Sequence, residues 1–268
     1  MVYNKGMPEL PEVEVLRREL TPVLVGQRIL EAHIADPHLG VPKGVLEGKT
    51  ILALERLGKY LLFPFEEGGC LVVHLGMTGQ LEVTKENAPR KHERARFVLS
   101  SGTHLSFIDP RRFGKISLLD AKETLQRKLG IDPYSPDFTF SRFQALLEGR
   151  KRLKDFLLDQ RNLAGIGNIY ASEILFWARL HPRRSINSLS LEEQERLFKS
   201  IRKVLDEAIA AKGTTIRDFR RPGGESGGFQ NLLSVYGKTE CPRCKGPVVR
   251  EVLSSRSTYF CPQCQPLA

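Results

Sequence analysis

The spacing of apolar residues near the start of the chain predicts a helix over residues 8–25. Val13, Leu16, Leu20 and Leu24 recur at three- and four-residue intervals, which places them on one face of an α-helix. Charged residues, among them an Arg-Arg-Glu run, occupy positions between them. The first element is therefore expected to be an amphipathic helix with one buried side.

The pattern changes after Arg28, where short apolar runs replace the helical period. Glycine-containing segments separate several of these runs, as is typical of an antiparallel sandwich or barrel. The segment 130–137 then carries two prolines and no periodicity, so we place a domain boundary there. The runs predicted as strands lie at 51–54, 60–65, 71–74, 80–83, 95–100, 104–108 and 115–119.

The second half of the chain returns to a helical period. Its clearest helix is expected from Ser190 to Ala211, because Ser190 and Glu193 have the spacing of a capping box and Gly213 can end the helix. Residues 220–231 contain four glycines and are predicted to form a mobile loop. Strands followed by helices indicate an α+β protein with more than one domain.

Length and charge narrow the class of protein. A chain of 268 residues suggests two domains with room for a small appendage. The net charge is +10: residues 1–137 carry 19 Lys and Arg against 18 Asp and Glu, and residues 138–268 carry 22 against 13. This asymmetry favours a basic face that binds a polyanion, although a solvated basic surface would carry the same charge. A membrane-surface role fits less well, because the basic residues do not form one amphipathic helix.

The chain shows no pattern of a membrane or secreted protein. No apolar run approaches the roughly 20 residues needed to span a bilayer. Residues 1–7 lack the apolar core of a signal peptide. We therefore expect a cytoplasmic protein.

Four cysteines near the C-terminus have the spacing of a zinc ribbon. Cys241 and Cys244 form one C-x2-C pair and Cys261 and Cys264 form another, with sixteen residues between the two pairs. Disulfides and a redox-active pair are the alternatives, but two matched pairs in a cytosolic protein favour one structural Zn²⁺. Four protein ligands leave no open position for a water, so the metal is not expected to be catalytic. The fifth cysteine, Cys70, is expected in the core.

The segment between the cysteine pairs offers a phosphate contact. Two strands tethered by the metal would hold Arg256 near the tip of a hairpin, where a guanidinium can grip a phosphate through two hydrogen bonds. Neighbouring serines and Thr258 add donors. An ordinary surface arginine is the alternative.

Several blocks resemble those of the formamidopyrimidine-DNA glycosylase family (Fpg, or MutM), in the order the family has them. The first is Met7-Pro-Glu-Leu-Pro-Glu-Val-Glu14, and the last is the cysteine site. The resemblance implies an α+β multidomain fold with an N-terminal helix and β-sandwich, a helix–two-turn–helix (H2TH) domain and a zinc finger. The implied limits are 8–130 for the catalytic domain, 131–137 for a linker, 138–235 for the H2TH domain and 236–268 for the zinc finger. Between the first and last blocks lie Leu57–Tyr60, His74–Gly79, Asp109–Gly114, Gly165–Glu173 and Val235–Gly237.

The resemblance also implies a reaction. Pro8 would be the nucleophile, a secondary amine that attacks a deoxyribose, expels an oxidised purine such as 8-oxoguanine or a formamidopyrimidine, and forms a Schiff base. Glu9 would act as general acid and base at the sugar ring oxygen, and Lys59 as a cation near the lesion phosphate. β,δ-Elimination would then cut the abasic strand. Without the other blocks, Pro8 and Glu9 would be read as an ordinary helix start.

Further residues of the chain match the DNA contacts of the family. Met77, Arg111 and Phe113 match the group that fills the gap left by an everted base and holds the opposite base, although Met77 and Phe113 alone would suggest core residues. The glycines before the helix expected near residue 169 would let backbone N–H groups approach a phosphate. Lys154, Asn168 and Arg256 match phosphate contacts, and the further phosphate or lesion-loop candidates are His74, Gly167, Gly228 and Tyr236. The expected partner is double-stranded DNA with oxidised bases or abasic sites, bound by a monomer associated with the nucleoid.

The chain departs from the family pattern at its beginning. Residues 1–6 precede Met7, and within a peptide bond the nitrogen of Pro8 is a tertiary amide without a nucleophilic lone pair. We expect residues 1–7 to be a non-native or removed extension. If it is retained, the alternative is a zinc-ribbon DNA-binding protein without catalysis. A second alternative is an endonuclease VIII-like enzyme for oxidised pyrimidines, against which Leu10 and the glycine-rich loop argue.

Overall fold

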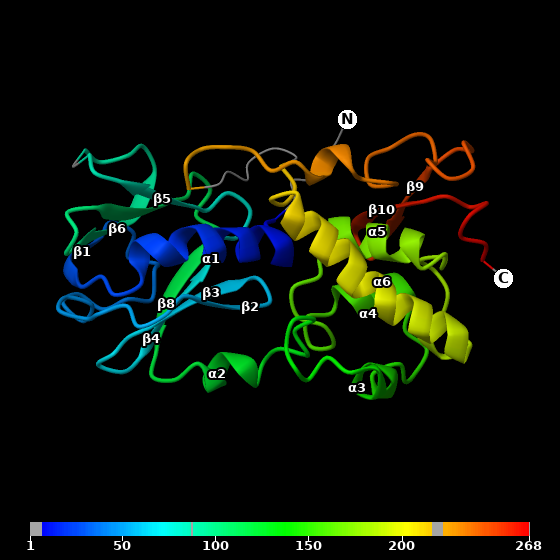
Figure 1. Cartoon of the computed structure of the whole chain (residues 1–268), viewed down its shortest axis with the longest axis horizontal. Helices are drawn as coiled ribbons and strands as arrows, with labels where there is room; N and C mark the ends of the chain where they lie inside the picture. Colours follow the sequence, from blue (N-terminus) through cyan, green and yellow to red (C-terminus); the bar gives the residue numbers. More distant parts are fainter. Residues whose placement is uncertain (1–6, 87, 216–221, 268) are drawn as a thin grey trace.

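Two four-stranded antiparallel sheets form a sandwich in the N-terminal half (Figure 1) of the computed structural model, which describes residues 7–86, 88–215 and 222–267. Buried residues of both sheets form a common apolar core, and Leu62, Cys70 and Val72 form a smaller one on the other face of the second sheet. One sheet has the order β1-β6-β7-β5, with β1 (Ile29–Ile34), β5 (Gln80–Thr84), β6 (Glu93–Leu99) and β7 (His104–Ile108). The other has the order β2-β3-β4-β8, with β2 (Glu55–Leu57), β3 (Tyr60–Pro64), β4 (Cys70–His74) and β8 (Lys115–Leu119).

The strand predictions hold for six of the seven runs, and the run at 51–54 is wrong. Ile51 makes only an isolated bridge to Phe65, and the backbone hydrogen bonds of this stretch go to two different segments. Ile51 pairs with residues 26 and 27, whereas Leu52 donates to Pro64. A chain that changes partner after one residue forms no ladder. Leu52 is also more than half exposed. Residues 51–54 therefore connect two segments and do not form a buried strand.

Helix α1 (Leu10–Leu24) is the predicted first helix, and it belongs to two cores at once (Figure 1). Val13, Leu16 and Leu20 pack against the sandwich, whereas Leu10 and Val15 belong to the core of the second domain. Every residue from Leu10 to Leu16 is therefore buried, including two glutamates. The first two turns of the helix therefore pack against both domains.

The second domain is helical and is built around α5 (Asn168–Trp177), of which nearly every residue is buried. The predicted long helix is α6 (Leu191–Ala210), and its capping box is formed by Ser190 and Glu193 as expected. Helices α5 and α6 are neighbours (Figure 1), and residues of both belong to the second core. The shorter elements are α2 (Glu123–Gln126), α3 (Phe140–Ala145), α4 (Leu153–Leu158) and the 3-10 turns η1 (Ile186–Ser188) and η2 (Phe229–Asn231).

The C-terminal segment forms the predicted hairpin, with β9 (Val249–Leu253) paired to β10 (Arg256–Phe260). Ser254 and Ser255 both have positive φ, 46° and 59°, the backbone of a tight two-residue turn. Cys70 is buried in a small core beside β3, as expected. None of the helices among the described residues is long and apolar enough to cross a membrane.

Candidate active site

A cavity of about 400 Å³ opens between the sandwich and the helical domain. Its walls come from the start of α1, the β2–β3 turn, the end of β4, the start of α5 and the zinc hairpin. Residues far apart in the sequence therefore meet at one place. Eight of the residues predicted from the sequence line it: Glu9, Lys59, His74, Met77, Gly167, Asn168, Tyr236 and Arg256. Pro8 is buried directly before Glu9.

Glu9 occupies the position that the sequence suggested for a phosphate. Its carboxylate accepts hydrogen bonds from the backbone N–H of Gly167 (2.8 Å), Ile169 (2.9 Å) and Tyr170 (3.3 Å) at the N-terminus of α5. A Cβ on Gly167 would lie 2.3 Å from Cδ of Glu9. The expectation that these glycines let backbone amides approach a phosphate is therefore corrected. Gly167 admits the carboxylate of Glu9, which takes the anion position at the helix start, whereas Gly165 lies against the side chain of Leu10.

Glu9 and Lys59 both line the cavity, and the charge of each acts on the pKa of the other. Burial raises the pKa of Glu9, while Lys59 and the three backbone N–H groups act in the opposite direction. Burial also lowers the pKa of Lys59, opposed by the charges of Glu9 and Glu12 and assisted by Arg256. The pKa of Glu9 is thus raised and the pKa of Lys59 is lowered, because burial disfavours the charged form of each. Such a pair suits proton transfer.

Glu12 is a site residue that the sequence interpretation missed. Its carboxylate accepts from the backbone N–H of Glu9 (2.8 Å), the hydroxyl of Tyr170 (2.5 Å) and the backbone N–H of Thr214 (2.7 Å). Burial, and then the charge of Glu9, raise the pKa of Glu12 to about 7. The signal was present, because a glutamate three residues after a helix start has the capping-box spacing. Glu12 links the start of α1 to the segment after α6.

His74 reaches the cavity as a neutral imidazole. Burial, with Lys59 and Lys115 nearby, lowers its pKa to about 4. Nδ1 accepts the backbone N–H of Gly76 at 3.2 Å, so the proton lies on Nε2. The ring packs against Tyr60, with centroids 4.7 Å apart. His74 can therefore donate one hydrogen bond without adding charge.

The predicted intercalating residues are carried by a turn organised around Asp109. Its fully buried carboxylate accepts from the hydroxyl of Thr78 (2.5 Å) and from the backbone N–H of Arg111 (3.2 Å) and Gly114 (2.7 Å). Thr78 follows Met77, so one carboxylate fixes both segments. Phe113 is 48% exposed, and the guanidinium of Arg111 lies 4.5 Å from its ring centre. An exposed Phe113 is not a core residue, which removes that alternative.

Lys154 does not lie where a phosphate could reach it. The side chain is fully buried, and Nζ donates to the carbonyl of Asn168 (3.0 Å) and the hydroxyl of Ser172 (2.8 Å). Burial lowers the pKa of Lys154 to about 7. The expectation of a direct phosphate contact is therefore corrected for this structure, in which Lys154 supports the first turn of α5.

Three further predicted residues belong to the second domain: Asn168, Gly228 and Tyr236. Asn168 Nδ2 donates to the carbonyl of Ser257 in the zinc hairpin (2.8 Å) and contacts the Tyr236 hydroxyl (3.4 Å). Gly228 lies outside the cavity lining, and its N–H donates to Ala211 at 2.8 Å, at the root of the glycine-rich loop. Residues 216–221, which include the start of that loop, lie outside the described residues, as do residues 1–6.

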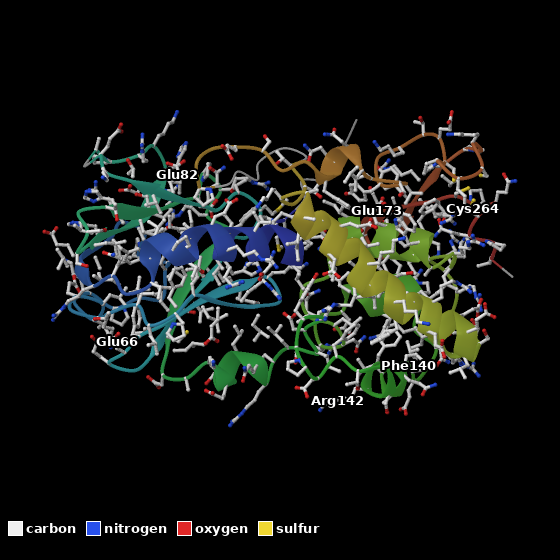
Figure 2. All side chains as sticks on the ribbon, viewed as in Figure 1. Glu66, Glu82, Phe140, Arg142, Glu173 and Cys264 are labelled. Atoms are coloured by element: carbon white, nitrogen blue, oxygen red, sulfur yellow. The ribbon has the colours of Figure 1, made fainter. Side chains whose placement is uncertain are left out.

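Glu173 is a second buried glutamate that the sequence did not single out. It lies within the helical domain (Figure 2), and its carboxylate accepts the backbone N–H groups of residues 234, 235 and 236 at 2.8–3.0 Å. Burial raises the pKa of Glu173. This contact fixes the segment that carries Tyr236.

The four C-terminal cysteines meet at the outer end of the second domain, where Cys264 is labelled in Figure 2. The Sγ atoms of Cys241 and Cys264 are 3.8 Å apart, those of Cys244 and Cys261 are 3.5 Å apart, and all four lie within 4.8 Å of one another. Thiolates about 2.3 Å from a tetrahedral Zn²⁺ would be separated by about 3.8 Å. The cysteines therefore fit one structural zinc ion.

Comparison with known proteins places the whole chain in one family. It is 46% identical to the formamidopyrimidine-DNA glycosylase of Thermomicrobium roseum, with 97% of this chain and all of the relative covered. Family models match residues 7–116 (formamidopyrimidine-DNA glycosylase N-terminal domain), 129–220 (formamidopyrimidine-DNA glycosylase H2TH domain) and 240–267 (zinc finger found in FPG and IleRS). The chain belongs to the formamidopyrimidine-DNA glycosylase family.

Solved structures of this family share the fold. The MutM (Fpg) protein of Thermus thermophilus superimposes with a TM-score of 0.88 at 45% identity, covering 96% of this chain and 98% of that one. The Lactococcus lactis Fpg, solved in complex with DNA containing an abasic site, superimposes with a TM-score of 0.89 at 36% identity, covering 96% and 99%. The α+β fold with an N-terminal helix and sandwich, an H2TH domain and a zinc finger is confirmed.

Proposed function

We propose that this protein is a formamidopyrimidine-DNA glycosylase that excises oxidised purines from duplex DNA and cleaves the resulting abasic strand. The observation that carries the proposal is the meeting of Glu9, Lys59 and Arg256 at one cavity, directly beside the buried Pro8. The relative from Lactococcus lactis has been solved with abasic and with Fapy-dG-containing DNA, which supports the same substrate class here.

The nucleophile of the proposed reaction is the nitrogen of Pro8. As a free secondary amine it attacks C1′ of the deoxyribose, the bond from C1′ to the base breaks, and an iminium ion forms. This step requires an active form that begins at Pro8, because an acylated proline nitrogen has no lone pair to donate. Met7 in front of Pro8 lines the cavity, so its removal would both free the amine and enlarge the space beside Glu9.

Glu9 is proposed to move protons at the sugar. The raised pKa of its carboxyl favours a protonated form that can donate to the ring oxygen as the ring opens. The iminium acidifies the C2′ proton. Loss of that proton breaks the bond from C3′ to oxygen, and a second elimination breaks the bond from C5′ to oxygen. Lys59 would face the phosphate beside the lesion, where it balances negative charge.

The remaining predicted residues are proposed to hold the DNA. Met77, Arg111 and Phe113 fill the gap left by the everted nucleotide, and Asn168 and Arg256 contact phosphates. The zinc ion, when bound by the four cysteines, stabilises the hairpin that carries Arg256. A clamp of this kind needs one subunit, so we propose a monomer that is held at the nucleoid by its DNA binding.

Borohydride trapping tests the proposal directly. Protein that begins at Pro8 should form a covalent adduct with a duplex containing 8-oxoguanine. The matched control carries one additional residue before Pro8, which keeps the fold but acylates the nitrogen, and it should form none. Equal trapping by both forms, or by neither, contradicts the proposed nucleophile. A duplex containing thymine glycol run in parallel separates the purine-directed reaction from an endonuclease VIII-like one.

A further inference from the structure

The position of Lys59 is set by a tight turn between two strands. Leu57 and Tyr60 are paired in the β2–β3 ladder, so Gly58 and Lys59 form a two-residue connection. Gly58 has φ +55°, and a Cβ on it would approach Ala164 and the backbone N of Gly165 to 3.1 and 3.2 Å. The turn thus lies directly against the segment that leads into α5. The contact of Gly58 with this segment therefore limits where the backbone of Lys59 can lie.

A buried carboxylate from outside the sandwich holds the same turn. Asp132 lies in the segment between the two domains and is 6% exposed. Its Oδ2 accepts the backbone N–H of Gly58 at 2.8 Å. Its two oxygens also accept Nη1 and Nη2 of Arg56 at 2.6 and 3.1 Å. Asp132 therefore binds Gly58, the residue before Lys59, through its backbone N–H. It binds Arg56, at the end of β2, through an ion pair with two hydrogen bonds.

Arg56 extends this contact to the first helix. Its Nε donates to Glu14 of α1 at 3.1 Å, and its Nη1 also donates to the carbonyl of Gly58 at 3.2 Å. The side chains of Arg56, Glu14 and Asp132 are each less than one-tenth exposed. A buried charge network of this kind is sensitive to the loss of any member, because the partner left behind stays desolvated.

Through this network, Asp132 influences the position of Lys59 relative to Glu9. Glu9 is fixed to the second domain by the amides of α5, whereas Lys59 is on the sandwich. We propose that Asp132 is a positioning residue for the reaction: through Gly58 and Arg56 it holds Lys59 opposite Glu9 and keeps the two walls of the cavity in register. This role rests on the proposed function, since it has meaning only if Lys59 acts in that cavity.

Asp132→Asn tests the role with little change in shape. An amide cannot accept from Gly58 and from both Arg56 nitrogens, so the turn should loosen. In protein beginning at Pro8, the single-turnover excision rate should fall by about 10- to 100-fold, the range of coupling between residues in one network. Asp132→Glu keeps the charge and should recover most of the rate. Asp137→Asn, an exposed carboxylate of the same segment, is the matched control and should stay at the parent rate.

A double-mutant cycle separates positioning from general destabilisation. If Asp132 acts through Lys59, then Asp132→Asn should cost less than about twofold in a Lys59→Ala background. An equal cost in both backgrounds, or a parent rate for Asp132→Asn, overturns the proposal. If Asp132→Asn does not fold, Arg56→Lys enters the same cycle with the same expectation. A parent that forms no covalent adduct refutes the proposed function, whereas an active parent with an unaffected Asp132→Asn refutes only the role of Asp132.

Discussion

The cavity and the turn that carries Arg111 and Phe113 are each organised by a buried carboxylate, but the hydrogen-bond donors of the two carboxylates lie at different distances along the chain. Glu9 is held by backbone amides about 160 residues away, in another domain. Asp109 is held by Thr78 and by its own turn, all within the sandwich. The geometry of the cavity therefore depends on how the two domains dock, whereas the turn around Asp109 is complete within one domain. Changes to the buried groups of the cavity should impair reaction steps, whereas changes to exposed residues such as Arg256 should impair binding.

The largest effect is expected at Glu9. Glu9→Gln keeps the size of the side chain but removes an ionisable proton donor. Excision should slow by about 10²- to 10⁴-fold, the usual contribution of a general acid or base, while affinity for abasic-site DNA should change little. Single-turnover kinetics and a binding titration measure the two quantities. Glu192→Gln, which alters an exposed glutamate of α6, is the control. A Glu9→Gln enzyme that excises at the parent rate would show that the proton comes from elsewhere.

Glu12 should make the stability of the protein depend on pH. Its pKa in the folded protein is about 7, raised from an ordinary value of 4.5, so the folded state binds this proton more tightly than the unfolded state. The contribution to stability is fully present below about pH 4.5 and is lost as pH rises through about 7, at a cost of about 3 kcal/mol. The difference in unfolding free energy between parent and Glu12→Gln should therefore change across this window. A difference that stays constant with pH would contradict the raised pKa.

Gly167 tests the close approach on which the cavity depends. In Gly167→Ala the new methyl group would collide with the carboxylate of Glu9, which should destabilise the protein by about 1 to 3 kcal/mol and reduce excision. Gly40→Ala, in the sandwich and outside the cavity lining, is a matched control, because the nearest atom to its Cβ position lies at an ordinary 3.6 Å and its φ is not positive. Denaturant unfolding and excision rates should separate the two variants. Equal behaviour would mean that Glu9 can move aside without consequence.

The sequence predicts elements better than it predicts contacts between them. The helix 8–25, the capped helix after Ser190 and the cysteine pairs follow from local spacing, which is a property of neighbouring residues. The run at 51–54 was wrong because its partners, and not its composition, decide whether a strand forms. The glycines at 165 and 167 were correctly taken to mark a close approach. Their partners were misassigned, since Gly167 approaches the carboxylate of Glu9, 158 residues away along the chain, and Gly165 approaches Leu10.

The same limit explains Lys154 and Glu173. A lysine in a basic cluster is read as exposed, yet Lys154 is enclosed by α5 and holds its first turn. Glu173 in an apolar helix gives no local sign that it binds three backbone amides. Buried charged residues are paired through tertiary contacts, which no periodicity reveals. By contrast, the place of Arg256 in the hairpin could be predicted, because the spacing of the two cysteine pairs already indicates two metal-tethered strands with Arg256 near their tip.

Arg256 should show the smallest effect, and one of a different kind. It begins β10 of the zinc hairpin and lines the cavity, where a guanidinium can bind a phosphate through two hydrogen bonds. Arg256→Ala should weaken binding to abasic-site DNA by about tenfold and reduce the slope of log affinity against log salt by about one unit. Its zinc content should be unchanged, since the cysteines are intact.

The control is Arg142→Ala, which removes an exposed arginine from α3, on the side of the second domain away from the hairpin (Figure 2). Both substitutions lower the net charge equally, so a general electrostatic effect would weaken binding and the salt slope alike in both. A loss confined to Arg256 would identify a specific phosphate contact. In that case the hairpin acts on binding while Glu9 acts on the chemical step, and the two regions are separable by experiment as well as by geometry.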